Sequence, residues 1–302
     1  MSIQLLRAEI KGFDVPYNGA YSESDAIGHS DLRKIASCPS RWFKAPKHDD
    51  PSNSMLWGSL VDALLFGIGF DRFEVRPETY RNDKGEEKPW NANSNACKDW
   101  LADHEGKEVI SKQLKTNAVH AVNLIRADAR CSRLLMAAQY QCWLEGVYLD
   151  ADTGLEITVR GLVDIVPDRF GEYGAYLADL KTTGDASMDK WKRQLENMWY
   201  HVQAAIYLDM WNKATGEDRT EFAHVIQENE YPYEIAHRSV SDEWLRQGRA
   251  CYKAALQTYA RCKASGVWEG LDASAEGFEP VPFDAYVQLR SGVANEDSAM
   301  PF

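Results

Sequence analysis

The sequence predicts an α/β fold, in which strand-forming and helix-forming segments share one chain. Three observations indicate this class. Between residues 140 and 182, apolar and β-branched residues form three strand-like runs, and the first two flank DADTG, a good hairpin turn. Helical periodicity marks long segments before and after these runs, at 111–136, 191–211 and 242–264. The 302 residues, 44% hydrophobic and 26% charged, also match a globular protein with an ample core.

The N-terminal third is expected to be mainly helical. Residues 1–26 read as a short extended lead-in that is rich in Gly, Tyr and Ser. Ser30 is a candidate N-cap for a short helix that ends before the next proline. The strongly apolar run at 55–67, MLWGSLVDALLFG, predicts a buried helix that contains one ionisable residue, Asp62. The polar segment 80–95 predicts an exposed loop.

The remaining elements follow the same two periodicities. Expected strands lie at 140–149, 155–166, 175–182, 221–229 and 233–237, and the helices at 191–211 and 242–264 separate or follow them. Residues 27–270 are therefore expected to form one domain, with a helical N-terminal part at about 27–136 and a core at about 137–270. Residues 271–302 would be a C-terminal tail, whose last residues we expect to be mobile.

Composition excludes several classes of protein. The net charge of −12 argues against coating nucleic acid through a broad basic surface, although a local basic channel remains compatible with it. The six cysteines are scattered without a C-x-x-C pair, which predicts reduced thiols and neither a structural metal nor an iron–sulfur cluster. No apolar run is long enough to span a membrane, and the N-terminus lacks signal-peptide features. We expect a cytoplasmic protein that is not attached to a membrane.

The segment from 160 to 183, RGLVDIVPDRFGEYGAYLADLKTT, contains the main candidate site. Asp179 and Lys181 are two residues apart on a strand and should project to the same face. Asp164, on the preceding strand, can join them. Two carboxylates can hold a divalent cation, and a neighbouring lysine can orient or deprotonate water, so this set suits phosphodiester hydrolysis. The alternatives are a surface salt bridge and a solvated aspartate at a strand end.

Other candidates surround this set. Gln203 and Tyr207 lie one helical turn apart and share a face, where they could contact DNA, support Lys181 or simply pack. Asp62 either pairs locally or lines a metal cleft, because an unpaired carboxylate rarely stays buried. Glu145 is equally well explained as a further metal ligand, direct or through water, and as an ordinary half-exposed residue.

Three basic residues, Lys190, Lys192 and Arg193, lie near the start of the helix that carries the Q-x-x-x-Y pair. They could contact DNA phosphates, although a solvated charged face explains them as well. The histidines show no H-E-x-x-H or H-x-x-E-H spacing, so His29 and His201 are not expected to bind metal.

The order D-x(14)-D-L-K followed by Q-x-x-x-Y resembles the PD-(D/E)xK nuclease superfamily, in its RecB-like branch. The N-terminal SDLRKIASCPSRWF, the GSLVDALLFG helix and the RNDKG…W loop further resemble the exonuclease VIII (RecE) nuclease domains of phages and prophages. The resemblance runs from about His29 to about Gly266. It implies a restriction-endonuclease-like α/β core, with a mixed central sheet flanked by helices and helical N-terminal additions.

The resemblance also implies an activity. Such enzymes digest double-stranded DNA from its ends with Mg²⁺, 5′ to 3′, and leave a 3′ single strand for a RecT-like annealing protein in DNA recombination and repair. Asp164 and Asp179 would bind the metal, with Mn²⁺ as a substitute, and Lys181 would position or activate water. Gln203 and Tyr207 match the family's helix motif. Asp62 stands where many relatives have a metal-binding histidine, which leaves its own role open.

Three alternatives remain open from the sequence. The chain could be a structure-specific or single-strand endonuclease of the same superfamily, a non-catalytic DNA-binding module, or a hydrolase of other phosphoesters. The intact set of Asp164, Asp179 and Lys181 argues against a non-catalytic module. Processive relatives form rings, so a homo-oligomer is also expected from the resemblance.

Overall fold

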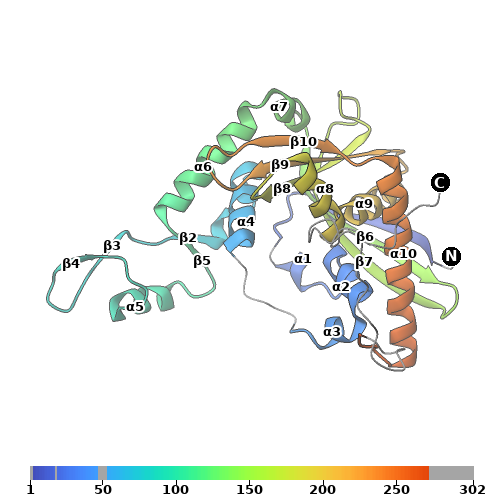
Figure 1. The fold of residues 1–302 in the computed structure, drawn as a ribbon, viewed down its shortest axis with the longest axis horizontal. Coiled ribbons are helices and arrows are strands. Elements are labelled where there is room, and N and C mark those ends of the chain that lie inside the picture. Colours follow the sequence, from blue (N-terminus) through green and yellow to red (C-terminus); the bar gives the residue numbers. More distant parts are fainter. Residues whose placement is uncertain (1–2, 18, 47–52, 272–302) are drawn as a thin grey trace, which may run out of the picture.

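A computed structural model describes residues 3–17, 19–46 and 53–271, and its centre is a six-stranded mixed sheet (Figure 1). The strand order is β1 (Ile3–Gly12), β6 (Gln139–Asp150), β7 (Leu155–Val166), β8 (Tyr176–Thr183), β9 (Glu221–Glu228) and β10 (Ile235–Ser239). Neighbouring strands are antiparallel except for β8 and β9, which are parallel and therefore need a helical crossover. The predicted α/β class with a mixed sheet is confirmed.

Helices cover both faces of the sheet. α9 (Tyr200–Thr215) and α10 (Asp242–Ser265) pack with Leu177 and Phe222 into one hydrophobic core. On the opposite face, α4 (Asn53–Phe66) and α6 (Lys112–Ala127) pack with Leu180 and Val225 into a second core. The shorter helices are α1 (Ala20–Glu23), α2 (His29–Ser37), α3 (Pro39–Lys44), α7 (Ala129–Leu135) and α8 (Met188–Asn197). None of the helices within the described residues is long and apolar enough to cross a membrane.

The N-terminal segment is part of the sheet. We expected residues 1–26 to be an extended lead-in outside the main domain, but β1 pairs with β6 from Ile3 opposite Asp150 to Gly12 opposite Trp143. The core thus begins far ahead of residue 137. The expected tail falls outside the described residues from 272 onward.

Two expected long helices are each broken, one by a single residue and the other by two residues. In the segment 111–136, Asp128 ends α6 and caps α7 by accepting hydrogen bonds from the backbone N–H groups of Arg130 and Cys131. In the segment 191–211, Trp199 has a φ of 60°, and the chain changes direction between α8 and α9. Hydrophobic periodicity continues through both breaks, so it could not reveal them.

An arm leaves the body between β2 (Phe73–Val75) and β5 (Glu108–Ile110), which pair in parallel. It contains a hairpin of β3 (Thr79–Arg81) and β4 (Glu87–Pro89), where we expected only a loop, and helix α5 (Asn95–Asp103). Figure 1 shows the arm projecting away from the sheet. Trp100 packs edge-on against Trp90 at 5.4 Å and stacks on His104, so the arm has packing of its own.

β7 and β8 separate almost as soon as they meet. Their antiparallel ladder has the pair Ile165 and Ala178, beyond which the strands diverge into a fork. Below the fork, Ile27 takes the free edge of β7: its N–H donates to the Thr158 carbonyl and its carbonyl accepts from the Arg160 N–H, both at 2.9 Å. The candidate site lies in this fork.

Candidate active site

Asp164 bridges the fork between the two strands. Because β7 has moved away, the Leu180 N–H of β8 lacks a ladder partner, and it donates instead to Asp164 Oδ2 at 3.0 Å. Gln141 Nε2 donates to Asp164 Oδ1 at 3.2 Å. Gln141 has a φ of 45°, a backbone conformation that few non-glycine residues adopt. Asp164 is therefore held by both strands that flank its own.

Asp179 and Lys181 lie on the same face of β8, as strand alternation requires. The Lys181 ammonium forms an ion pair with Asp179 Oδ2, and Gln203 Nε2 donates to Oδ1 at 3.1 Å. Asp179 is almost fully buried, so its carboxylate depends on these two side chains for polar contacts. The Lys181 ammonium also lies 4.9 Å from the ring centre of Tyr200, a cation–π distance.

Tyr207 contacts β7, the other strand of the fork. Its hydroxyl accepts a hydrogen bond from the Leu162 N–H of β7 at 3.2 Å and one from Gln203 Nε2 at 3.4 Å. The ring packs directly over Gly161, where an added Cβ would lie 2.5 Å from Tyr207 Cε1. Gly161 therefore permits the close approach of α9 to β7.

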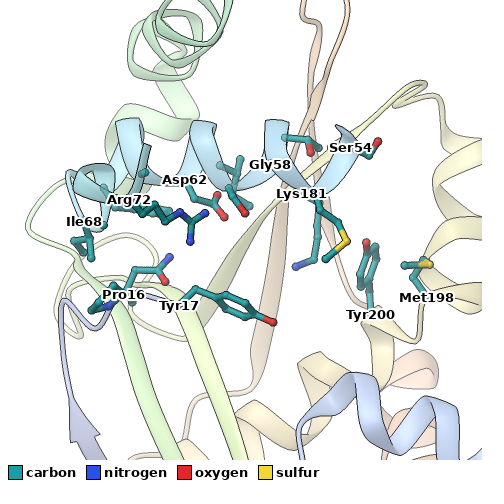
Figure 2. A pocket seen from close by; sticks show the side chains of 18 of the residues that line it. Pro16, Tyr17, Ser54, Gly58, Asp62, Ile68, Arg72, Lys181, Met198 and Tyr200 are labelled. Atoms are coloured by element: carbon teal, nitrogen blue, oxygen red, sulfur yellow. The ribbon is translucent and has the colours of Figure 1, made fainter. Parts of the chain in front are cut away.

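A cavity of about 570 Å³ opens above the cluster, between α4 and β8 (Figure 2). Asp62 projects into it from α4, and Lys181 projects into it from β8. The Arg72 guanidinium and the Tyr17 hydroxyl also point into this space. α4 can lie close to β8 because of Gly58, where an added Cβ would stand 3.2 Å from Thr182 Oγ1.

Burial, and after it the repulsion between neighbouring carboxylates, shifts the pKa values of the cluster. Burial and the neighbouring Asp179 raise the pKa of Asp164 well above its ordinary value. Burial and the neighbouring Asp179 together raise the pKa of Asp62 to about 7, against the opposing effect of Lys181. Burial alone would lower the pKa of Lys181, but Asp179 and Asp164 raise it above its ordinary value. The cluster therefore contains more negative charge than one lysine offsets.

The residues present fit a divalent cation. Asp164, Asp179 and Asp62 offer only oxygen atoms, the ligands that Mg²⁺ and Mn²⁺ prefer. Burial and the neighbouring Asp179 raise the pKa of Asp164 well above its ordinary value, and a bound cation would offset this negative charge. This fit rests on donor chemistry and charge.

A family model described as a PDDEXK-like domain of unknown function (DUF3799) matches residues 28–275, most of the chain. The chain belongs to this family. Its membership confirms the predicted PD-(D/E)xK superfamily and fold, and together with the acidic cluster it supports a nuclease. PD-(D/E)xK nucleases generally depend on divalent metals, which agrees with the oxygen-rich cluster.

The fold has a counterpart among solved structures. The crystal structure of a "Putative exonuclease" from Eubacterium rectale is similar to 92% of this chain and 97% of its own, with a TM-score of 0.54 and 13% sequence identity. At that identity the likeness concerns the fold. A comparison with curated protein sequences finds no match.

In this PDDEXK-like domain, Glu145 is not brought to the cluster. It lies further along β6, where Lys11 Nζ is 3.9 Å from its carboxylate and Ser24 Oγ is 3.5 Å away. Of the predicted DNA-binding residues, Lys190 and Arg193 line a separate hollow on α8, and Lys192 does not. All three basic side chains are exposed.

The structure adds residues that sequence reasoning missed. Arg72, Gln141 and Tyr200 line the cavity, and His224 pairs in register with Asp179 across the parallel β8–β9 ladder. His224 is buried and neither ring nitrogen has a hydrogen-bond partner among the described residues. No spacing pattern signals these residues, because elements distant in sequence bring them in.

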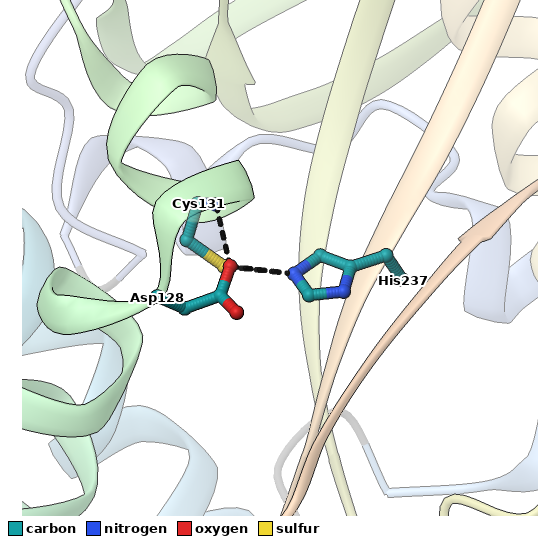
Figure 3. A group of neighbouring side chains, drawn as sticks. All are labelled: Asp128, Cys131 and His237. Carbon is teal, nitrogen blue, oxygen red and sulfur yellow. Dashed lines mark hydrogen bonds and ion pairs between the residues drawn. The ribbon is translucent and has the colours of Figure 1, made fainter.

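Among the described residues, Asp128, Cys131 and His237 form a group whose donor atoms all lie within 4.8 Å of one another, close enough to hold one ion (Figure 3). The three carboxylates Asp62, Asp164 and Asp179 do not form such a group. The group of Asp128, Cys131 and His237 is relevant to the expectation, drawn from the scattered cysteines, that the chain has no structural metal. Asp128 Oδ1 lies 3.0 Å from His237 Nε2, and Cys131 Sγ lies 3.3 Å from the same nitrogen. Because the Asp128 carboxylate also caps α7, hydrogen bonds alone account for this arrangement, which ties α7 to β10.

Proposed function

We propose that this chain is a Mg²⁺-dependent exodeoxyribonuclease that degrades linear double-stranded DNA from its ends, 5′ to 3′, and leaves 3′ single-stranded tails. The observation that carries this proposal is the convergence of Asp164, Asp179 and Lys181 in the fork between β7 and β8, beneath an open cavity. Membership of a PDDEXK-like family supports the same chemistry. The 5′ to 3′ direction rests on the exonuclease VIII resemblance alone.

Each residue of the cluster has a role in this proposal. Asp164, Asp179 and Asp62 would hold the divalent cation, which supplies Lewis-acid activation of the scissile phosphate and of water. Lys181 stabilises the negative charge that develops during hydrolysis and orients the attacking water. Gln203 keeps Asp179 Oδ1 in place through its hydrogen bond of 3.1 Å. Tyr207 helps to hold β7 in position, because its hydroxyl accepts a hydrogen bond from the β7 backbone.

Burial of the cluster favours action at a DNA end. Asp179 is 1% exposed and Asp164 is 9% exposed, so a phosphodiester must enter the cavity to approach them. Paired bases hinder that entry, since a duplex keeps its strands stacked and paired. Opening base pairs costs least at an end, where only one side of the pair is stacked. This argument favours linear over intact circular duplex DNA.

A single-strand or structure-specific endonuclease would use the same cluster. Three DNA substrates of the same sequence separate these functions when each is incubated with Mg²⁺. They are a linear duplex, a covalently closed duplex circle and a single-stranded circle. The exonuclease predicts loss of the linear duplex with both circles intact. Cleavage of either circle would instead establish the endonuclease, and no cleavage of any substrate would favour the DNA-binding module.

The partners belong to the same proposal. A 3′ tail is the substrate of a strand-annealing protein, so we propose a RecT-like partner in DNA recombination and repair, in phage or prophage context and in the cytoplasm. A ring of several copies around the duplex would make digestion processive. The residue-level roles above do not depend on either feature.

A further inference from the structure

A second hollow of about 580 Å³ lies between α2, α3 and the start of α9. Arg33, Lys34 and Arg41 line it together with the aromatic rings of Trp42 and Trp199. Among the described residues no carboxylate lines it. In a chain of net charge −12, a hollow lined by three cations is set apart from the average surface.

The three cations have no acidic partner within the described residues. The side chains of Lys34 and Arg41 take part in no ion pair or hydrogen bond there, although their backbones do. The Arg33 guanidinium donates to the Asn197 carbonyl at 3.3 Å and contacts Met198 Sδ at 3.5 Å, both uncharged. Their charge is therefore available to an anionic ligand.

A third hollow lies between this hollow and the catalytic cavity and shares lining residues with each. This third hollow, of about 500 Å³ on α8, is lined by two cations, Lys190 and Arg193, and by one carboxylate, Asp185. It shares Asn197 with the α2–α3 hollow, and it shares Gln194 and Met198 with the catalytic cavity. Met198, which lies beside Tyr200 in Figure 2, is 37% exposed. The three hollows thus follow one another along the surface from Lys181 toward Trp42.

We propose that these hollows form a track for one strand of DNA that leads from the catalytic cavity across α8 to the α2–α3 hollow. Phosphates would contact Arg33, Lys34 and Arg41, and unpaired bases would stack on Trp42 and Trp199, which line the hollow and are both half-buried. Cations interleaved with aromatic rings are suited to single strands, because a duplex hides its base faces. This inference rests on the proposed nuclease function and adds a binding subsite to it.

The test measures binding without cleavage. A fluorescent single-stranded oligonucleotide of about 16 nucleotides is titrated with the metal-free protein in EDTA, at several salt concentrations, and anisotropy is recorded. The variant is the triple substitution Arg33→Ala, Lys34→Ala, Arg41→Ala. The matched control removes the same charge from the arm, through Arg81→Ala, Lys84→Ala and Lys98→Ala, all exposed residues.

The track predicts about tenfold or greater loss of affinity for the first variant only, with a slope of log affinity against log salt that is shallower by about 2. A charge-conserving variant, Arg33→Lys with Arg41→Lys, keeps most of the affinity and shows that the loss is not misfolding. Equal affinity of the two triple variants would overturn the inference.

Failure of the track and failure of the nuclease are distinguishable. If the wild type digests linear DNA with Mg²⁺ but the two triple variants bind alike, the track alone is wrong. If the wild type digests nothing but loses single-strand binding in the first variant only, the binding site stands and the nuclease proposal fails.

Discussion

The geometry of the site depends on the absence of a side chain at Gly161. Replacement by alanine places a Cβ against the Tyr207 ring, which α9 holds rigidly. Gly161→Ala is therefore expected to destabilise the protein by about 1–3 kcal/mol and to reduce nuclease activity, because overpacking displaces Tyr207. Thermal unfolding and DNA hydrolysis measure both effects.

Gly146→Ala is the matched control, because its Cβ would meet the flexible side chain of Met210 at 2.9 Å. This change should have smaller effects on stability and on hydrolysis. Equal effects of the two substitutions would show that the packing of Tyr207 over Gly161 has no special importance.

The hydroxyl of Tyr207 has a structural role that its motif does not reveal. Tyr207→Phe leaves the Leu162 N–H buried without a partner, at a cost of about 1–3 kcal/mol, while the acidic cluster stays complete. We expect lower stability with hydrolysis reduced but retained. Complete loss of hydrolysis at unchanged stability would mean that the hydroxyl acts in the reaction itself.

At this scale the sequence predicts same-face pairs well and long-range partners poorly. Asp179 and Lys181 share a face because side chains alternate along a strand, and Gln203 and Tyr207 share one because a helical turn separates them. Arg72, Gln141 and His224 reach the site through packing of distant elements, which no local spacing encodes.

Among the elements, α4 decides where Asp62 lies. Its contact with β8 runs through Gly58 and Thr182, so a larger residue at position 58 should push the helix away from the strand. We expect graded loss of hydrolysis, slight for Gly58→Ala and severe for Gly58→Val, as Asp62 moves from Asp164 and Asp179. Hydrolysis rates at saturating Mg²⁺, with a circular dichroism check of folding, measure the series.

A folded Gly58→Val variant with wild-type activity would contradict the assigned position of Asp62 in the site.

The helix itself was predictable from the apolar run at 55–67, but its docking onto β8 was not. The two helix breaks escaped prediction for a related reason: the αL conformation of Trp199 and the capping by Asp128 interrupt hydrophobic patterns that otherwise continue.

At the scale of the whole molecule, the arm between β2 and β5 is expected to be separable. β2 and β5 pair in parallel, so the arm leaves beside Ile110, whose carbonyl accepts from the Arg76 N–H, and returns beside Phe73, which pairs with Glu108. A Gly-Ser linker of about a dozen residues in place of 77–107 can run back along this pair. It should leave the core folded, with an unfolding temperature within a few degrees of the wild type. Thermal melting and hydrolysis of linear duplex DNA test this.

Aggregation or unfolding of the shortened chain would show that the arm stabilises the core.

The sequence predicted the class of fold and most strands of the sheet, because alternation over 140–182 is strong. It could not show that residues 3–12 complete the sheet edge, since one strand carries no sign of its partner.

The central claim is that Asp179 and Lys181 catalyse DNA hydrolysis with a divalent metal. The most direct measurement is release of label from end-labelled linear duplex DNA in Mg²⁺ by the wild type, Asp179→Asn and Lys181→Ala, with Lys98→Ala from the arm as control. We expect rapid release of label by the wild type and by the control. Release by the two site variants should be slower by about a hundredfold or more. A wild type inactive in both Mg²⁺ and Mn²⁺, or site variants as active as the control, would contradict it.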